Sequence, residues 1–165
     1  MKYPAVATLL LSTLLWVSCG KADEYPFICE GFQQDAPAGD SADIKMPTAF
    51  TPNGDGLNDE LKPVLHHISG YTFTLYNVNE RVIFTTQDPA FGYAASRPMD
   101  KDMYYYRIEA ISIKGNRVAR CGSVYALNCL PGGARLADFT FGDQLKPYNP
   151  DVYPSGTAEV LTACP

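Results

Sequence analysis

Positive charge is scarce in this 165-residue chain, and it is nowhere clustered. Lysine and arginine number 13 against 18 aspartate and glutamate residues, for a net charge of −5. Because a nucleic-acid-binding surface needs a basic patch, the composition argues against nucleic acid as a partner. The sequence also lacks a Gly-x-Ser-x-Gly elbow, a His-Glu-x-x-His motif and a phosphate-cradling glycine loop. We therefore expect that the protein is not an enzyme and has no resident cofactor.

The first residues have the features of a bacterial export signal. Lys2 precedes an apolar run over residues 5–17, which is shorter than the ~20 residues that a spanning helix needs. The run ends at Val17-Ser18-Cys19, which resembles a lipobox, where a signal peptidase cleaves before a cysteine that receives lipid. Cleavage by an ordinary signal peptidase near the same place is the alternative. We expect a signal peptide over residues 1–18 and membrane anchoring through lipidated Cys19.

The residues after Cys19 form an expected tether. A lysine followed by acidic residues resembles the surface-export signal of Bacteroidetes lipoproteins. Residues 19–44 show no hydrophobic periodicity, so we expect them to act as a lipidated linker. The expected location is the outer membrane, with the protein on the cell surface or, alternatively, on the periplasmic face.

Short alternating runs separated by turns fill residues 45–129. Strands are expected at 46–50, at 61–66, in a hairpin over 71–86, and in a second hairpin that joins 103–113 with 116–127. Pro63 suits an edge strand. No helical stripe appears, so the pattern predicts an all-β fold, an antiparallel β-sandwich of about seven strands. Residues 130–165 are expected to form an irregular C-terminal extension, with one or two strands, that packs on the sandwich.

The cysteines other than Cys19 predict two disulfides. They are Cys29, Cys121, Cys129 and Cys164, and an even number in an exported chain favours a disulfide framework. A continuous strand would hold Cys121 and Cys129 roughly 26 Å apart, far beyond the ~7 Å that a disulfide allows. The pairing Cys29–Cys121 with Cys129–Cys164 is favoured, and the crossed pairing is the alternative. No CxxC or Cys/His spacing supports a metal site instead.

One loop has the composition of a cation site. Asn53, Asp55, Asn58 and Asp59 place four oxygen-bearing side chains within seven residues, in a loop that also contains two glycines. Calcium binds to loops of this kind, although the complete EF-hand pattern is missing. The alternative is that these side chains cap the turn by accepting backbone N–H groups.

Two further features concern side-chain direction. Alternation puts Tyr104 and Tyr106 on the core face and Tyr105 on the more exposed face, where Tyr105 is a candidate contact for sugar or protein. His66 and His67 are adjacent in an expected strand, so they should point to opposite faces, which would prevent both from binding one metal ion.

The segment Pro47-Thr48-Ala49-Phe50-Thr51-Pro52-Asn53-Gly54-Asp55-Gly56-Leu57-Asn58-Asp59 resembles the opening of the gliding-motility-associated C-terminal domain family of Bacteroidetes. Later segments follow in family order, and together they extend the resemblance over about residues 45–128: Phe73-Thr74-Leu75-Tyr76-Asn77, Val82-Ile83-Phe84, Tyr104-Tyr105-Tyr106 and Gly122-Ser123-Val124-Tyr125-Ala126-Leu127. The resemblance implies an immunoglobulin-like β-sandwich whose first and last strands run parallel. Such a topology again favours Cys29 as the partner of Cys121.

Members of this family often act as type IX secretion sorting domains at a chain end, whereas more than thirty residues follow the last family segment here. We therefore expect a cell-envelope lipoprotein that presents an immunoglobulin-like domain for protein binding, adhesion or envelope assembly, with an envelope or surface protein as its partner. A carbohydrate-binding accessory lipoprotein of a nutrient-uptake system is one alternative, and it would need an exposed aromatic cluster around Tyr105 or in the extension. A type IX secretion sorting domain is the other.

Overall fold

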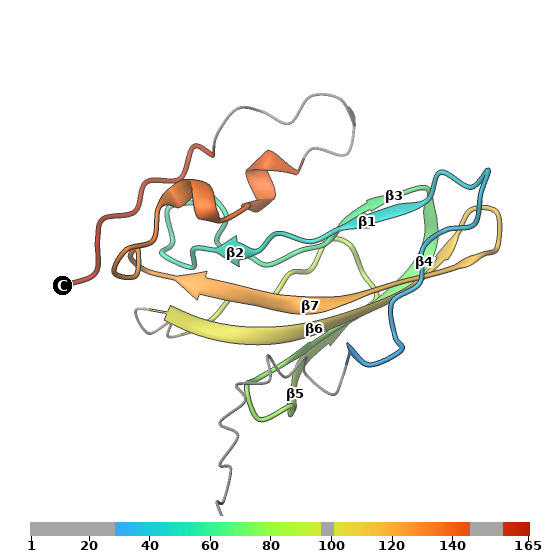
Figure 1. Cartoon of the computed structure of the whole chain (residues 1–165), viewed down its shortest axis with the longest axis horizontal. Helices are drawn as coiled ribbons and strands as arrows, with labels where there is room; N and C mark the ends of the chain where they lie inside the picture. Colours follow the sequence, from blue (N-terminus) through green and yellow to red (C-terminus); the bar gives the residue numbers. More distant parts are fainter. Residues whose placement is uncertain (1–28, 97–100, 146–156) are drawn as a thin grey trace, which may run out of the picture.

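The computed structural model of the chain describes residues 29–96, 101–145 and 157–165 (Figure 1). These residues form mostly β-strands, arranged in two sheets, so the expected all-β class is confirmed. One sheet has five strands in the order β2-β7-β6-β4-β5, and the other pairs β1 with β3. The predicted signal peptide, the lipidation site Cys19 and the first part of the tether lie outside the described residues.

The longest hairpin forms the middle of the five-stranded sheet. β6 (Lys101–Ser112) and β7 (Arg117–Leu127) pair antiparallel along their whole length. Gly115 in the turn has a φ of 84°, a left-handed conformation that glycine adopts without steric cost. Ile108 and Ala110 are buried in the core cluster, on the face that the alternation predicts.

A second hairpin extends the sheet on the far side of β6. β4 (Ile68–Tyr76) pairs antiparallel with β6 on one side and with β5 (Val82–Thr86) on the other. In the turn, Asn77 Oδ1 accepts the N–H groups of Asn79 and Arg81 at 3.0 and 3.1 Å. A register shift between Leu75 and Tyr76 marks a bulge, which increases the local twist.

The remaining strands are short. β1 (Asp43–Lys45) and β3 (Val64–His66) pair antiparallel, and Figure 1 shows them above one face of the larger sheet. β2 (Ala49–Phe50) runs parallel to β7, as the family resemblance implies. The strand expected at 46–50 is therefore reduced to two residues. The strand expected at 61–66 begins only after Pro63, because proline has no N–H to contribute to a ladder.

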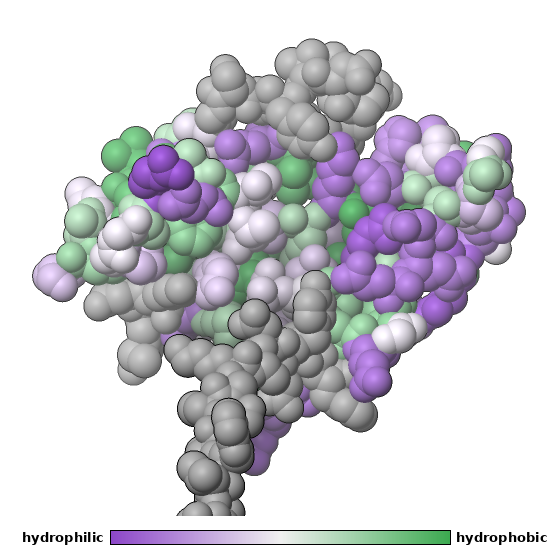
Figure 2. Space-filling view, in the orientation of Figure 1, coloured by the Kyte–Doolittle hydropathy of each residue, from purple (hydrophilic) through white to green (hydrophobic). Residues whose placement is uncertain are grey.

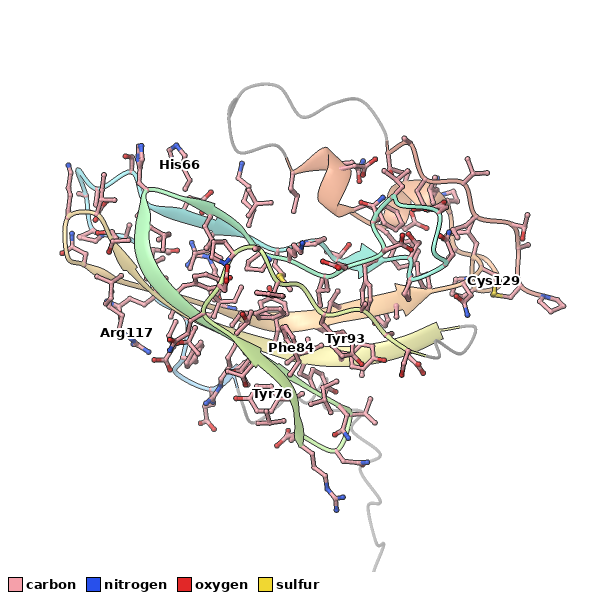
Figure 3. All side chains as sticks on the ribbon, turned by 180° about the vertical axis from the view of Figure 1, so that it is seen from behind. His66, Tyr76, Phe84, Tyr93, Arg117 and Cys129 are labelled. Atoms are coloured by element: carbon pink, nitrogen blue, oxygen red, sulfur yellow. A yellow bond between two sulfur atoms is a disulfide. The ribbon has the colours of Figure 1, made fainter. Side chains whose placement is uncertain are left out.

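The main hydrophobic core lies between the two sheets. Phe84 and Tyr93 contact each other near its border, with ring centroids 5.7 Å apart (Figure 3). Each fully buried apolar side chain contributes roughly 1.5–3 kcal/mol relative to an exposed one. The largest fully buried members are Phe50, Leu61, Phe73, Leu75, Ile108, Val118 and Val124.

Two disulfides tie the terminal segments to the five-stranded sheet. Cys29 is bonded to Cys121, with Cα atoms 5.5 Å apart, and Cys129 to Cys164, with Cα atoms 5.0 Å apart. This is the pairing that the sequence favoured, so the crossed alternative is wrong. The first bond forms because the chain before β1 runs along β7, where Gln34 pairs with Ala119.

The C-terminal extension differs from the prediction. Its described residues contain no strand, and Leu136–Asp138 (η2) and Gly142–Gln144 (η3) are short 3-10 helices. Asp138 accepts the N–H of Arg135, and Gln144 Oε1 accepts the N–H of Phe141. These side-chain bonds turn the backbone before and after residues 139–141, so the one or two strands expected in the extension do not form among its described residues. Apolar side chains gather on the surface at this end of the molecule in Figure 2.

Candidate functional site

The loop of residues 53–59 is held together by its own backbone. The Asp59 carboxylate accepts the N–H of Gly54 at 2.6 Å and of Gly56 at 2.7 Å. Asn53 and Asp55 each accept the N–H of the residue two positions later, at 2.9 and 2.8 Å. Three of the four candidate calcium ligands therefore cap the turn, as the alternative from the sequence had it.

Asn58, the fourth candidate ligand, contacts the C-terminal extension. Its Oδ1 accepts the N–H of Asp143 at 3.0 Å, and its Nδ2 donates to Glu159 Oε2 at 3.3 Å. The same Glu159 oxygen accepts the Thr51 hydroxyl at 2.5 Å, across 108 residues of sequence. The hydroxyl of Thr157 donates to the Asp143 carboxylate at 2.9 Å. The loop and the extension thus form one continuous polar contact.

Glu159 is the buried carboxylate of this contact. Only 3% of its surface is exposed, and its Oε1 accepts no hydrogen bond from the described residues. Sequence reasoning missed Glu159, because a single carboxylate in an irregular segment has no periodic signal that could identify it.

A groove of about 630 Å3 opens beside the same loop. Its lining includes Asn58, Asp59, Lys62 and Asp143, and Lys62 Nζ lies 2.7 Å from Glu60 Oε2. Within the described ranges, no three His, Cys, Asp or Glu side chains are grouped so that they could hold a metal ion. Calcium binding by the loop therefore stays a prediction.

Tyr105 lies on what we term the outer face, the face of the five-stranded sheet opposite the main core. It is directly opposite Tyr76 of β4, and both rings are partly buried against a small cluster that contains Phe32 and the Cys29–Cys121 disulfide. Sequence reasoning missed Tyr76. The alternation of β4 could have identified it, because Tyr76 has the same parity as the outward-facing threonines of that strand.

The neighbouring tyrosines of β6 are structural. Tyr104 and Tyr106 pack against the main core cluster, as predicted. Burial raises the pKa of the Tyr106 hydroxyl, and burial followed by a hydrogen bond with Tyr93 raises that of Tyr104. Of the three consecutive tyrosines, Tyr105 is the one on the outer face.

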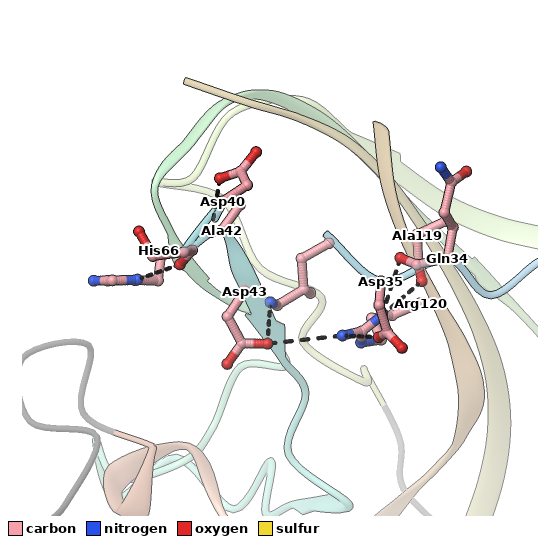
Figure 4. Close-up of polar contacts among 10 residues, drawn as sticks. Gln34, Asp35, Asp40, Ala42, Asp43, His66, Ala119 and Arg120 are labelled. Carbon is pink, nitrogen blue, oxygen red and sulfur yellow. Dashed lines mark hydrogen bonds and ion pairs between the residues drawn. The ribbon is translucent and has the colours of Figure 1, made fainter. Parts of the chain in front are cut away.

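The segment before β1 forms a wall along one side of the outer face. Gln34 exchanges two backbone hydrogen bonds with Ala119, and Arg120 donates to the Gln34 carbonyl at 3.1 Å. Arg120 also forms an ion pair with Asp35 at 2.8 Å (Figure 4). The Phe32 ring lies under the Arg107 guanidinium, 4.6 Å from its carbon, in cation–π geometry.

A groove of about 500 Å3 lies farther along the same strands. Thr72, Gln87, Glu109 and Arg117 contribute to its lining. Gln87 Nε2 donates to the Thr72 hydroxyl at 3.1 Å, and Arg117 lies 3.9 Å from Glu109. The amide, hydroxyl and charged groups of this groove can hydrogen-bond a polar ligand.

The prediction that His66 and His67 point to opposite faces is wrong. β3 ends at His66, and His67 adopts a left-handed φ of 52°, which brings the two ring centroids to 3.8 Å. His67 Nδ1 contacts the Ser41 hydroxyl, and His66 Nδ1 contacts the Ser41 carbonyl oxygen. The pair therefore links the turn after β3 to the segment before β1.

Within the described part of the chain, no helix has the length and apolar character needed to cross a membrane. Comparison with known proteins gives no match to a family model, to a curated protein or to a solved structure. The functional proposal therefore depends on the sequence motifs and on the geometry above.

Proposed function

We propose that this chain is a cell-envelope lipoprotein, anchored through Cys19, that presents an immunoglobulin-like β-sandwich for protein binding, adhesion or envelope assembly. One observation carries the proposal. Four of the five cysteines form the two disulfides, and the fifth is Cys19, directly after the apolar run. Disulfides persist in oxidising compartments, so this pairing agrees with export. Each buried CH2 of an attached lipid adds about 0.8 kcal/mol, so a multiply acylated cysteine gives a durable anchor.

The immunoglobulin-like topology is supported by two features. The small β1–β3 sheet packs over the larger sheet around a shared core, and β2 runs parallel to β7. Two packed sheets that enclose one core are the basis of a β-sandwich. The thirteen-residue motif at 47–59 adds the family resemblance.

Replacement of the anchoring cysteine tests the proposed membrane location. We expect Cys19→Ala to move the protein from the membrane fraction to the soluble fraction and to abolish labelling with an alkyne fatty acid. Cys164→Ala is the matched control, because it removes a cysteine from the folded domain and should leave both readouts unchanged. Membrane partition and labelling that survive in Cys19→Ala would overturn the lipoprotein proposal. Protease treatment of intact cells then distinguishes the surface from the periplasmic face.

A second candidate function, carbohydrate binding for a nutrient-uptake system, is favoured by the paired Tyr76 and Tyr105. Stacking on an aromatic ring contributes about 0.5–1.5 kcal/mol, so losing one ring should weaken sugar binding roughly two- to twelvefold. The test is a glycan array followed by calorimetry with Tyr76→Ala and Tyr105→Ala. Phe91→Ala is the control, because Phe91 is 64% exposed in the loop after β5. Glycan binding that is equal in all variants, or absent from the wild type, excludes this candidate.

A further inference from the structure

The edge of β2 that faces away from β7 is covered by the C-terminal extension. Thr140 is the point of contact: its carbonyl oxygen accepts the N–H of Thr48 at 2.8 Å and of Ala49 at 3.2 Å. In return, the Thr140 N–H donates to the Thr48 hydroxyl at 2.7 Å. Backbone groups of an edge strand form a ready template for another extended segment. Here a segment of the same chain uses that template.

An aromatic anchor accompanies the backbone contact. Phe141 is fully buried, with 0% exposure, in a cluster with Ala49 and Leu127 that is separate from the main core. Phe139 packs edge-on against Tyr125, with ring centroids 6.1 Å apart. Main-chain bonds at a sheet edge together with a pocketed side chain are the two components of peptide recognition by strand addition.

The covered state includes an energetic cost. Docking of the extension buries Glu159, whose Oε1 has no hydrogen-bond partner among the described residues. An unsatisfied buried polar atom destabilises by about 1–3 kcal/mol. The Cys129–Cys164 disulfide closes a loop of 35 residues, which keeps the segment near β2 at a high effective concentration. The unsatisfied Glu159 oxygen thus offsets part of the stabilisation from the buried Phe141 and the Thr51–Glu159 hydrogen bond, which lowers the free energy that a competing segment must supply to displace the extension.

We propose that the β2 edge and the Phe141 pocket form a peptide-binding site that residues 139–141 occupy in cis. The partner that fits the site is an extended segment of another protein with an aromatic residue at the position of Phe141. Residues 139–141, which occupy the site in this chain, indicate this requirement for an extended backbone with an aromatic side chain. This peptide site rests on the proposed protein-binding function and gives it a place, the β2 edge, and a means of regulation, occupancy by residues 139–141. It requires neither the lipid anchor nor the sugar site.

A labelled peptide with the sequence of residues 136–144 is the probe, and fluorescence anisotropy measures its binding to the full chain. We expect weak binding to the wild type, because the cis segment competes. Binding should be at least tenfold tighter to Phe141→Ala, which keeps the disulfide but empties the pocket. The combined variant Cys129→Ala with Cys164→Ala should also bind more tightly than the wild type. The same peptide with Phe141→Asp is the matched control and should not bind.

Two outcomes overturn the proposal: no peptide binding to variants whose circular dichroism shows a folded protein, or equal binding of the Phe141→Asp peptide. If the variants do not fold, peptide binding to the wild type tests the site instead. Millimolar peptide should then shift the NMR resonances of the Thr48 and Ala49 amides, and unshifted resonances refute the site. Because fractionation of Cys19→Ala does not depend on this pocket, failure of the peptide test leaves the envelope proposal separately measurable.

Discussion

The hydrogen bond between Thr51 and Glu159 joins the loop to the extension, and a double-mutant cycle can measure its strength. Thr51 is fully buried, and its hydroxyl lies 2.5 Å from Glu159 Oε2 but 3.3 Å from the Leu57 carbonyl oxygen. Because a hydroxyl has one proton to donate, the shorter contact receives it. Thr51→Val removes this donor at nearly constant volume. Among the residues that the structure describes, the Glu159 carboxylate then keeps a single donor, Asn58 Nδ2 at 3.3 Å.

The expected magnitude follows from the buried carboxylate. A hydrogen bond to a charged group contributes about 1.5–3 kcal/mol, and a buried group that loses its partner retains its desolvation cost. Thr51→Val should therefore lower the free energy of unfolding by about 1.5–3 kcal/mol. Glu159→Met removes the carboxylate and its desolvation cost together, because the new side chain is apolar and similarly unbranched. In that background, we expect Thr51→Val to cost less than about 1 kcal/mol.

Urea unfolding followed by far-UV circular dichroism gives the free energy of unfolding of the wild type, the two single variants and the double variant. The comparison requires that the dependence of this free energy on urea concentration is the same in all four proteins. Thr85→Val is the matched control, since Thr85 is an exposed residue of β5. Its effect should be the same with and without Glu159→Met, within about 0.5 kcal/mol. If Thr51→Val and Glu159→Met are also additive within that margin, the hydroxyl–carboxylate bond does not stabilise the docked extension.

Three further predictions use standard stability measurements. Replacing Cys29 and Cys121 by alanine opens a loop of 92 residues and should cost about 4–5 kcal/mol in urea unfolding; a loss below 1 kcal/mol would contradict this. Asp59→Ala should cost about 1–2 kcal/mol in free energy of unfolding through two lost caps. Millimolar calcium added to the wild type decides between the two interpretations of the loop: the predicted ion site raises the Tm, and a purely capping loop leaves it unchanged. Hydrogen bonds from Asn116 and then Ser112 lower the pKa of the Asp40 carboxyl. The stability that ionised Asp40 contributes is therefore present above the unfolded pKa of about 3.9 and disappears as pH falls through the lowered folded pKa. The difference in Tm between wild type and Asp40→Asn should shrink from pH 7 to pH 2, and a difference that stays constant would refute this linkage.

The long strands could be predicted because one of their faces is buried. In β4, Tyr71, Phe73 and Leu75 are buried while Thr72 and Thr74 are not, and this period of two is visible in the sequence. β1 could not be predicted in the same way. Its three residues, Asp43–Lys45, bury only Ile44 between two charged side chains, which is too short for a periodic signal.

Backbone conformation accounts for the prediction that failed at the histidine pair. The expectation for His66 and His67 assumed continued extended backbone, but His67 takes a positive φ, which is uncommon for residues other than glycine even though histidine is among the types enriched there. Nothing in the local sequence indicates this. The polar contact of the extension was hidden for another reason: Glu159 and Thr51 meet across 108 residues, and such a contact depends on how the whole chain folds.

The two disulfide-tied segments restrict where a large partner can reach the five-stranded sheet. The segment before β1 covers Ala119 and Cys121, and residues 139–141 cover Leu127 at the other end of β7. Within the described residues, the outer face therefore remains open mainly over β4 and β5, where Val82 is 59% exposed. Tyr76 lies at this side, paired with Tyr105 of β6. Because both covering segments are bound covalently, a rigid partner must approach from the β5 side, whereas a flexible peptide can compete at the β2 edge. Binding at these two places should therefore be independent, and Tyr76→Ala should leave peptide affinity unchanged.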